Sequence, residues 1–137
     1  NDVKERFGAN AVAILGFRNA QAAILENDFK KTGANTLLCT DDGTYGRKGF
    51  VTAALEEYLE SERPDYICAC GPMVMLKKVT EIAMAHSIPC QISLEERMAC
   101  GVGACLGCAC KIRRNGEEVY LHVCKDGPVF SGEEVVF

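Results

Sequence analysis

The sequence has 137 residues, of which 48% are hydrophobic and 25% charged, and its formal net charge is −4. This length allows one ordinary domain or two small units, and the composition is that of a globular protein rather than a disordered one. No basic stripe interleaved with aromatic residues occurs, so we expect no nucleic-acid partner, and the cluster Lys111 to Arg114 indicates a solvated strand end. No apolar run approaches the roughly 20 residues of a membrane-spanning helix and no signal peptide is visible, so we expect no membrane association.

Nine cysteines are a high and odd number for a chain of this size. In a secreted protein they would indicate a disulfide framework. Without a targeting segment they favour reduced thiols or a metal site, and the cytoplasm is the expected location. The chain begins at Asn1 without a methionine and continues directly into charged, helix-like sequence. We therefore interpret it as part of a longer protein.

Strand and helix patterns alternate through the first two thirds of the chain. The apolar run Ala11 to Phe17 predicts a strand covered on both faces. The next segment predicts a helix over residues 19–33, with Ile24, Leu25 and Phe29 on one face.

Further strands are expected over residues 36–40, 66–70 and 89–95, and further helices over residues 50–63 and 71–86. A glycine-punctuated loop separates the second strand from the second helix. Strands that alternate with helices of this length predict βαβ units and a parallel sheet.

The composition of the sequence changes after Glu95, where glycine and cysteine become frequent. Asn115-Gly116 predicts a two-residue hairpin turn, and a loop with a final short strand is expected after Cys124. We therefore expect two domains, residues 1–95 and residues 96–137. A module of the second size has too small a core to be stable alone, so it is expected to need a metal or cross-links.

Four cysteines fall at a spacing that is typical of one kind of metal centre. The pattern is Cys100-x4-Cys105-x2-Cys108, with Cys124 at a distance. This is the plant-type pattern of a [2Fe–2S] cluster. Four thiolates must converge on a compact inorganic core, and the glycines between them allow backbone N–H groups to turn toward sulfur.

Other uses of these thiols are less favoured. Structural zinc sites use separated C-x2-4-C pairs, which this spacing does not match, and disulfides need an oxidising compartment. Cys110 lies two residues beyond Cys108 on an expected strand, so we predict that it packs in the core and is not a ligand. Cys39, Cys68 and Cys90 lie in apolar strands and are also expected in the core.

The segments SLEERMACGVGACLGCACKI and HVCKDGPVF closely resemble the cluster domain of the electron-transfer subunits of class 1B dihydroorotate dehydrogenases. The segments LLCTDDGTYGRKGFV and YICACGPMVMLKKV are similar to the NAD-binding region of the same subunits. The resemblance implies an α/β fold: a parallel-sheet, ferredoxin-reductase-like NAD-binding domain, incomplete at its N-terminus, followed by a small cysteine-rich [2Fe–2S] module. It also implies FAD and NAD as cofactors of the full-length protein.

The resemblance further implies a function in pyrimidine biosynthesis. Subunits of this family pair with an FMN-containing catalytic subunit that oxidises dihydroorotate to orotate. Electrons pass from FMN through the cluster and FAD to NAD+. The expected assembly of the full-length protein is therefore a hetero-oligomer.

By position, the resemblance implies a set of cluster ligands: Cys100, Cys105, Cys108 and Cys124. The implied nucleotide contacts are Cys70, Gly71 and Pro72 beside the nicotinamide, Asp41, Asp42 and Gly43 near the adenosine, and Arg18 at ribose or phosphate. Taken alone, these nucleotide segments are equally well explained as ordinary polar turns and a surface arginine.

The sequence departs from the family pattern at its start, because the flavin-binding barrel and the glycine-rich first turn would precede Asn1. The chain alone is therefore expected to be inactive with NADH. Related subunits that bifurcate electrons can carry aspartate at the first cluster position, so Cys100 favours the dihydroorotate type. The alternatives are a subunit of another NAD(P)H-linked reductase, of the sulfide dehydrogenase or ferredoxin:NADP oxidoreductase type, and a non-enzymatic iron–sulfur or zinc module.

Overall fold

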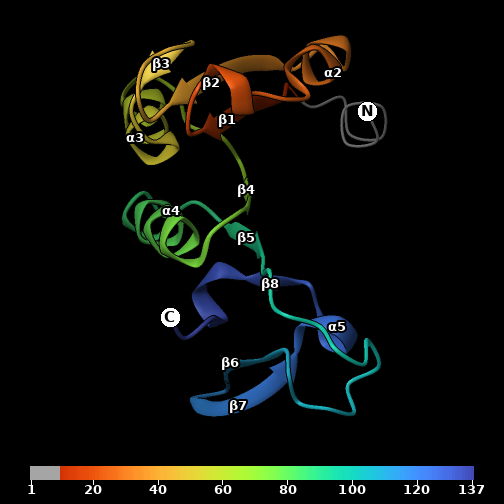
Figure 1. The fold of residues 1–137 in the computed structure, drawn as a ribbon. Helices are drawn as coiled ribbons and strands as arrows, with labels where there is room; N and C mark the ends of the chain where they lie inside the picture. Colours follow the sequence, from red (N-terminus) through yellow and green to blue (C-terminus); the bar gives the residue numbers. More distant parts are fainter. Residues whose placement is uncertain (1–9) are drawn as a thin grey trace. The chain divides into compact units, whose positions relative to one another are not determined.

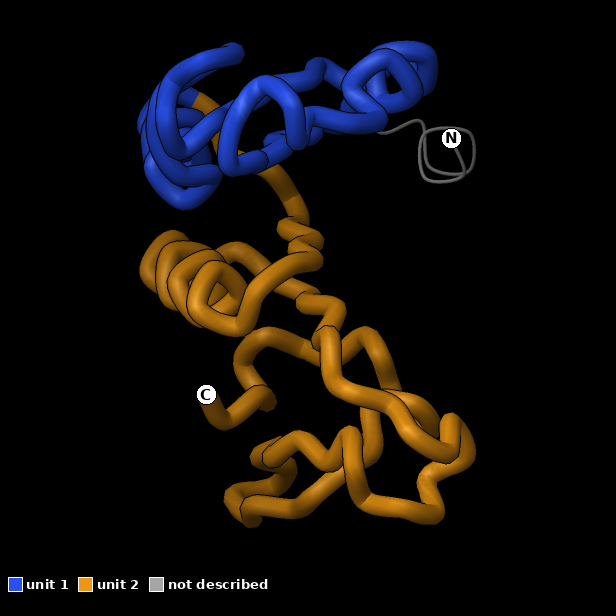
Figure 2. The backbone as a smooth tube through the Cα atoms, in the orientation of Figure 1, with its two compact units in different colours: residues 1–61 blue, residues 62–137 orange. Residues whose placement is uncertain are grey.

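The computed structural model describes residues 10–137, and the chain divides into two compact units, one ending at Ser61 and one of residues 62–137 (Figure 2). The helix-like sequence at the start of the chain lies outside the described residues. Residues 62–95 share the second unit with the cysteine-rich segment. The domain boundary near residue 95 stays a prediction.

The first unit is built on a parallel sheet of order β1-β2-β3 (Figure 1). β1 (Val12–Phe17) pairs with β2 (Asn35–Thr40) along its whole length, and β3 (Arg47–Lys48) adds a short edge. Helix α3 (Val51–Ser61) packs against β1. A Cβ atom at Gly16 would lie 2.5 Å from Val51 Cγ1, so the absence of a side chain lets α3 approach the strand.

The single helix predicted over residues 19–33 is wrong. The structure has a 3-10 turn at Ala20–Ala22 and a short helix, α2 (Glu26–Lys31). Leu25 has a φ of 62°, a left-handed conformation that interrupts the helical path. The three apolar residues predicted to share one helix face are exposed in the structure: Ile24 62%, Leu25 57% and Phe29 38%.

The second unit contains a sheet of order β4-β5-β8. β4 (Ile67–Cys70) and β5 (Cys90–Ser93) are parallel and are connected by helix α4 (Met73–Ala85), as the sequence predicts. β8 (Val129–Ser131) returns from the end of the chain and pairs antiparallel with β5. The cysteine-rich segment is thereby hydrogen-bonded into the same sheet as the predicted nicotinamide-side strand.

The rest of the second unit is a hairpin and a one-turn helix. β6 (Ala109–Arg114) and β7 (Glu117–His122) are antiparallel around the predicted Asn-Gly turn, in which both central residues have positive φ. Helix α5 (Val123–Asp126) follows, and a 3-10 turn, Gly132–Glu134, comes after β8. The small core of this part contains the fully buried side chains of Ile112 and Val123.

The predicted burial of the strand cysteines is confirmed at two positions and wrong at one. Cys39 and Cys90 are buried, whereas Cys68 is exposed on β4. Burial raises the pKa of the Cys90 thiol to about 11 and also raises that of Cys39. Within residues 10–137, no helix combines the length and the apolar character that crossing a membrane requires.

Candidate metal centre

The first three predicted ligands lie in a loop whose backbone turns its N–H groups toward sulfur. Cys100 Sγ accepts hydrogen bonds from Val102 N at 3.5 Å and Ala104 N at 3.3 Å, and Cys105 Sγ accepts one from Gly107 N at 3.5 Å. The winding of the loop depends on left-handed residues, among them Gly101 at a φ of 70° and Gly103 at 79°.

The fourth predicted ligand, Cys124, is brought to this loop by helix α5. Val123 N donates to the Cys108 carbonyl at 3.0 Å, and Cys124 N donates to Cys108 Sγ at 3.5 Å. Cys108 is only 2% exposed, so it forms the inner wall of the candidate site. A side chain that is distant in the sequence is thus fixed against the loop by two consecutive backbone bonds.

The four thiols are arranged as two pairs. Cys100 Sγ accepts from the N–H of Ala104, the residue beside Cys105, and Cys108 Sγ accepts from the N–H of Cys124. Among residues 10–137, no three His, Cys, Asp or Glu side chains are grouped as they would be around a single metal ion. Two pairs match the number of protein thiolates that the two irons of a [2Fe–2S] cluster take.

Backbone hydrogen bonds prepare one side of the site for metal binding. The N–H groups of Val102 and then Cys105 contribute most to lowering the pKa of the Cys100 thiol, to about 6. The hydrogen bond with Cys108 raises the pKa of Cys124, and a bond from the Gly103 N–H acts in the opposite direction. Because the thiolate is the form that ligates metals, the loop favours ligation at Cys100 even before an ion is bound.

Cys110 is separate from the two pairs. Its side chain is 8% exposed, and its Sγ donates to the Leu121 carbonyl across the hairpin at 3.5 Å. Burial raises the pKa of this thiol. These contacts support the prediction that Cys110 is a packing residue.

The rim of the candidate site is exposed and apolar. Met98, Val102 and Leu106 are 52%, 69% and 67% exposed. Side chains of this kind around a metal centre leave one side of it accessible to another protein or cofactor.

The predicted nicotinamide-side residues lie at the end of β4 in the same unit. Gly71 has a φ of 149°, a conformation that favours glycine, and Pro72 is the N-cap of α4. Cys70 Sγ donates to Glu95 Oε1 at 3.7 Å. The sequence pattern did not mark Glu95 as part of the site. A pocket of about 280 Å³ on this face is lined by Cys68, Ala69, Cys70, Gln91, Ser93 and Val129.

The predicted adenosine-side residues lie together in the first unit. Asp41 N donates to the Phe17 carbonyl at 3.0 Å, so Arg18 and the loop that begins at Asp41 occupy the same end of the sheet. Asp42 Oδ1 accepts bonds from Thr44 N at 2.9 Å and Thr44 Oγ1 at 2.7 Å, which lower the pKa of Asp42. Asp42 therefore shapes the loop, together with Gly43 at a φ of 77°.

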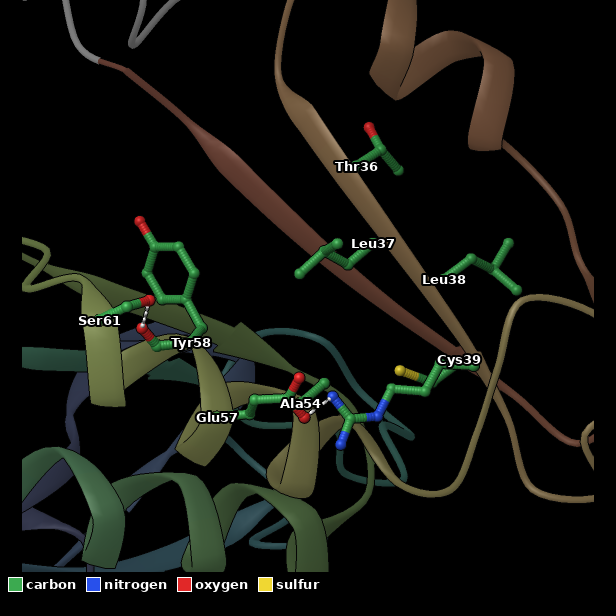
Figure 3. Close-up of a pocket in the computed structure, with 9 residues that line it drawn as sticks. Thr36, Leu37, Leu38, Cys39, Ala54, Glu57, Tyr58 and Ser61 are labelled. Atoms are coloured by element: carbon green, nitrogen blue, oxygen red, sulfur yellow. Dashed lines mark hydrogen bonds and ion pairs between the residues drawn. The ribbon is translucent and has the colours of Figure 1, made fainter.

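A second pocket of about 420 Å³ contains none of the predicted site residues (Figure 3). It lies between β2 and α3, with Leu37 and Tyr58 among its lining residues. Arg47 and Glu57, which also line it, form an ion pair.

The cysteine-rich segment matches a known protein family. Residues 95–136 match the family described as the iron-sulfur cluster binding domain of dihydroorotate dehydrogenase B. The chain is 48% identical over 123 residues to the dihydroorotate dehydrogenase B (NAD(+)), electron transfer subunit of Caldanaerobacter subterraneus, covering 90% of this chain and 48% of that protein. The Geobacillus thermodenitrificans protein of the same description is 44% identical over 129 residues, covering 94% of this chain and 48% of that protein.

The cysteine-rich segment therefore carries this iron-sulfur cluster binding domain, and the chain as a whole is similar to these electron transfer subunits. The chain spans about half the length of the curated relatives it matches. The resemblance found in the sequence is confirmed.

The fold is confirmed by a solved structure. The NADH-dependent reduced ferredoxin–NADP oxidoreductase, a protein of flavin-based electron bifurcation, matches 96% of this chain and 46% of its own with a TM-score of 0.79 and 32% identity. This similarity agrees with the predicted ferredoxin-reductase-like α/β fold.

Proposed function

We propose that this chain provides the cluster-binding and part of the NAD-binding region of an electron transfer subunit of dihydroorotate dehydrogenase. Such a protein serves pyrimidine biosynthesis by delivering electrons from dihydroorotate oxidation to NAD+. The observation that carries the proposal is that Cys124 N donates to Cys108 Sγ, which brings the distant cysteine to the loop whose N–H groups donate to the sulfurs of Cys100 and Cys105. When bound, a [2Fe–2S] cluster supplies one-electron transfer at a potential that hydrogen bonds to its sulfurs adjust.

In this proposal the chain's own residues hold the cluster and set its surroundings. The four cysteines are the ligands, and the N–H groups of Val102, Ala104, Gly107 and Cys124 donate to their sulfurs. Donors at thiolate sulfur offset negative charge, so they stabilise the reduced state. The exposed apolar rim allows close approach of the electron donor, which we propose to be an FMN-containing catalytic subunit in a hetero-oligomer.

The proposed nucleotide contacts form two groups, each within its own unit. Cys70, Gly71 and Pro72 would contact the nicotinamide, where a glycine backbone and the N-terminus of α4 favour close approach of a cofactor. Arg18, Asp41 and Gly43 would contact the adenosine portion, with Asp42 holding their loop in shape. NAD and FAD are the cofactors that we propose for the whole subunit.

We further propose that residues 1–95 and 96–137 are two functional domains, even though β8 joins the second to the sheet of the first. A cytoplasmic location is supported by nine cysteines that are all free thiols in the structure.

A second candidate function is favoured by the similarity to a ferredoxin–NADP oxidoreductase, which would make the chain part of another NAD(P)H-linked reductase. The two candidates share the cluster and differ in the partner. Purifying the chain with its bound partner and testing the complex with dihydroorotate separates them. Reduction of the cluster by dihydroorotate supports the first, and reduction by reduced ferredoxin alone supports the second.

Replacing each of five cysteines by serine tests the site itself. Anaerobically purified protein is expected to lose or change its visible cluster spectrum at four of the five replacements: Cys100, Cys105, Cys108 and Cys124. Cys110→Ser is the matched control and should retain the spectrum. Loss of the cluster in Cys110→Ser together with an unchanged spectrum in Cys124→Ser contradicts the assignment.

A further inference from the structure

The Asp126 carboxylate caps the one-turn helix that carries Cys124. Asp126 Oδ2 accepts a hydrogen bond from His122 N at 2.8 Å and lies 3.5 Å from His122 Nδ1. The two side chains are 30% and 19% exposed, so this contact is partly shielded from water. His122 is the N-cap of α5. The first N–H groups of a helix have no partner within the helix, and the Asp126 carboxylate accepts from one of them, the His122 N–H.

Three consecutive N–H groups of this turn have separate acceptors. His122 N donates to Asp126, Val123 N to the Cys108 carbonyl and Cys124 N to Cys108 Sγ. Val123 is fully buried, which anchors the middle of the turn. Because a four-residue helix has little stability of its own, the Asp126 bond fixes the backbone direction that the other two donors require.

We propose that Asp126 is a positioning residue for the cluster: it orients the His122 to Cys124 turn so that the Cys124 thiolate and the Cys124 N–H both face Cys108. This inference rests on the proposed cluster-binding function. Asp126 does not ligate iron in this account. It acts through the backbone of the turn, as residues outside the ligand shell do in other metal sites.

Two effects of Asp126 on the cluster have opposite signs, and two substitutions separate them. Removing the negative charge favours the reduced cluster and raises its midpoint potential. Losing the N–H···S bond to Cys108 disfavours the reduced cluster and lowers that potential. Asp126→Asn keeps an acceptor for His122 N without the charge, whereas Asp126→Ala removes both. The difference between these equally charged variants therefore reports positioning alone.

The test uses the cluster-loaded full chain, with EDTA as the competing chelator. Asp126→Ala is expected to lose its visible absorption at least about tenfold faster than the unmodified protein, since outer residues of metal sites typically contribute 10- to 100-fold. Asp126→Asn should fall between the two. The midpoint potential of the alanine variant should lie below that of the asparagine variant, and its electron paramagnetic resonance g values should shift. Exposed Glu117 on β7 provides the control, and Glu117→Gln should match the unmodified protein within about twofold.

Each outcome decides a different point. If the unmodified protein binds no cluster, the proposed function fails. If it binds one and both Asp126 variants release it at the unmodified rate with equal potentials, the positioning role is refuted. If neither variant loads a cluster, hydrogen exchange of the apo proteins decides. Unchanged protection of β4 and β5 supports a local role, and protection lost throughout that sheet refutes it.

Discussion

A methyl group added at Gly103 should loosen the cluster site more than one added at Gly101, because only one of these glycines faces a neighbour. Both have left-handed φ angles, 79° and 70°. A Cβ atom at Gly103 would lie 2.8 Å from Lys125 Cδ and 3.3 Å from Lys125 Cβ, whereas nothing lies within 4 Å of one at Gly101. The Lys125 side chain is flexible at its end, but its Cβ moves only with α5.

The expected magnitudes follow from this difference. Alanine in a left-handed conformation destabilises the folded loop by about 1 kcal/mol. In both variants the loop should therefore open about fivefold faster. Displacing the Lys125 side chain, whose Cδ, Cβ and Cγ atoms all lie within 4 Å of the added methyl group, adds about 1–2 kcal/mol at Gly103, as overpacking does elsewhere. Gly103→Ala should therefore release the cluster about 30- to 150-fold faster than the unmodified protein.

The assay is the decay of visible cluster absorption in EDTA under anaerobic conditions. Lys125→Ala in the Gly103→Ala background removes the Cγ and Cδ atoms that the new methyl group meets, so it should restore about half of the lost stability. In the Gly101→Ala background the same change should restore nothing. Equal release rates for the two glycine variants, or no rescue by Lys125→Ala, would refute this account of how α5 packs on the loop.

Three other predictions concern the two units more broadly. Iodoacetamide at pH 8 should alkylate exposed Cys68 and spare Cys90, because burial raises the pKa of the Cys90 thiol to about 11. Equal labelling of both cysteines in the folded protein, measured by mass spectrometry, would contradict this. Thr40→Val should cost about 1–3 kcal/mol, measured as lost hydrogen-exchange protection in the first unit, because the buried hydroxyl both donates to the Tyr45 carbonyl and accepts from the Tyr45 N–H. Ile112→Ala should cost about 2–5 kcal/mol in the second unit, where its side chain is fully buried, and unchanged protection of the hairpin would be the contrary result.

Local signals in the sequence predicted the features that depend on few residues. The Asn115-Gly116 pair is sufficient to specify the hairpin turn. The close spacing of Cys100, Cys105 and Cys108 is sufficient to place these three thiols in one loop. The parallel strands and α4 were predictable because their apolar runs and helical period are uninterrupted.

Other features depend on contacts that a sequence pattern does not contain. The break at Leu25 is a left-handed residue inside an otherwise helical pattern, so periodicity does not show it. Helix α5 has four residues, fewer than a helical period can be recognised in. Cys68 was predicted in the core because its strand is apolar, whereas in the structure it is exposed and lines a pocket together with other residues of β4.

Native mass spectrometry of the anaerobically purified chain, combined with iron, zinc and acid-labile sulfide analysis, tests the central claim most directly. The paired thiols predict about two irons and two inorganic sulfides per chain, lost together in Cys124→Ser and kept in Cys110→Ser. One zinc ion per chain without sulfide would contradict the account.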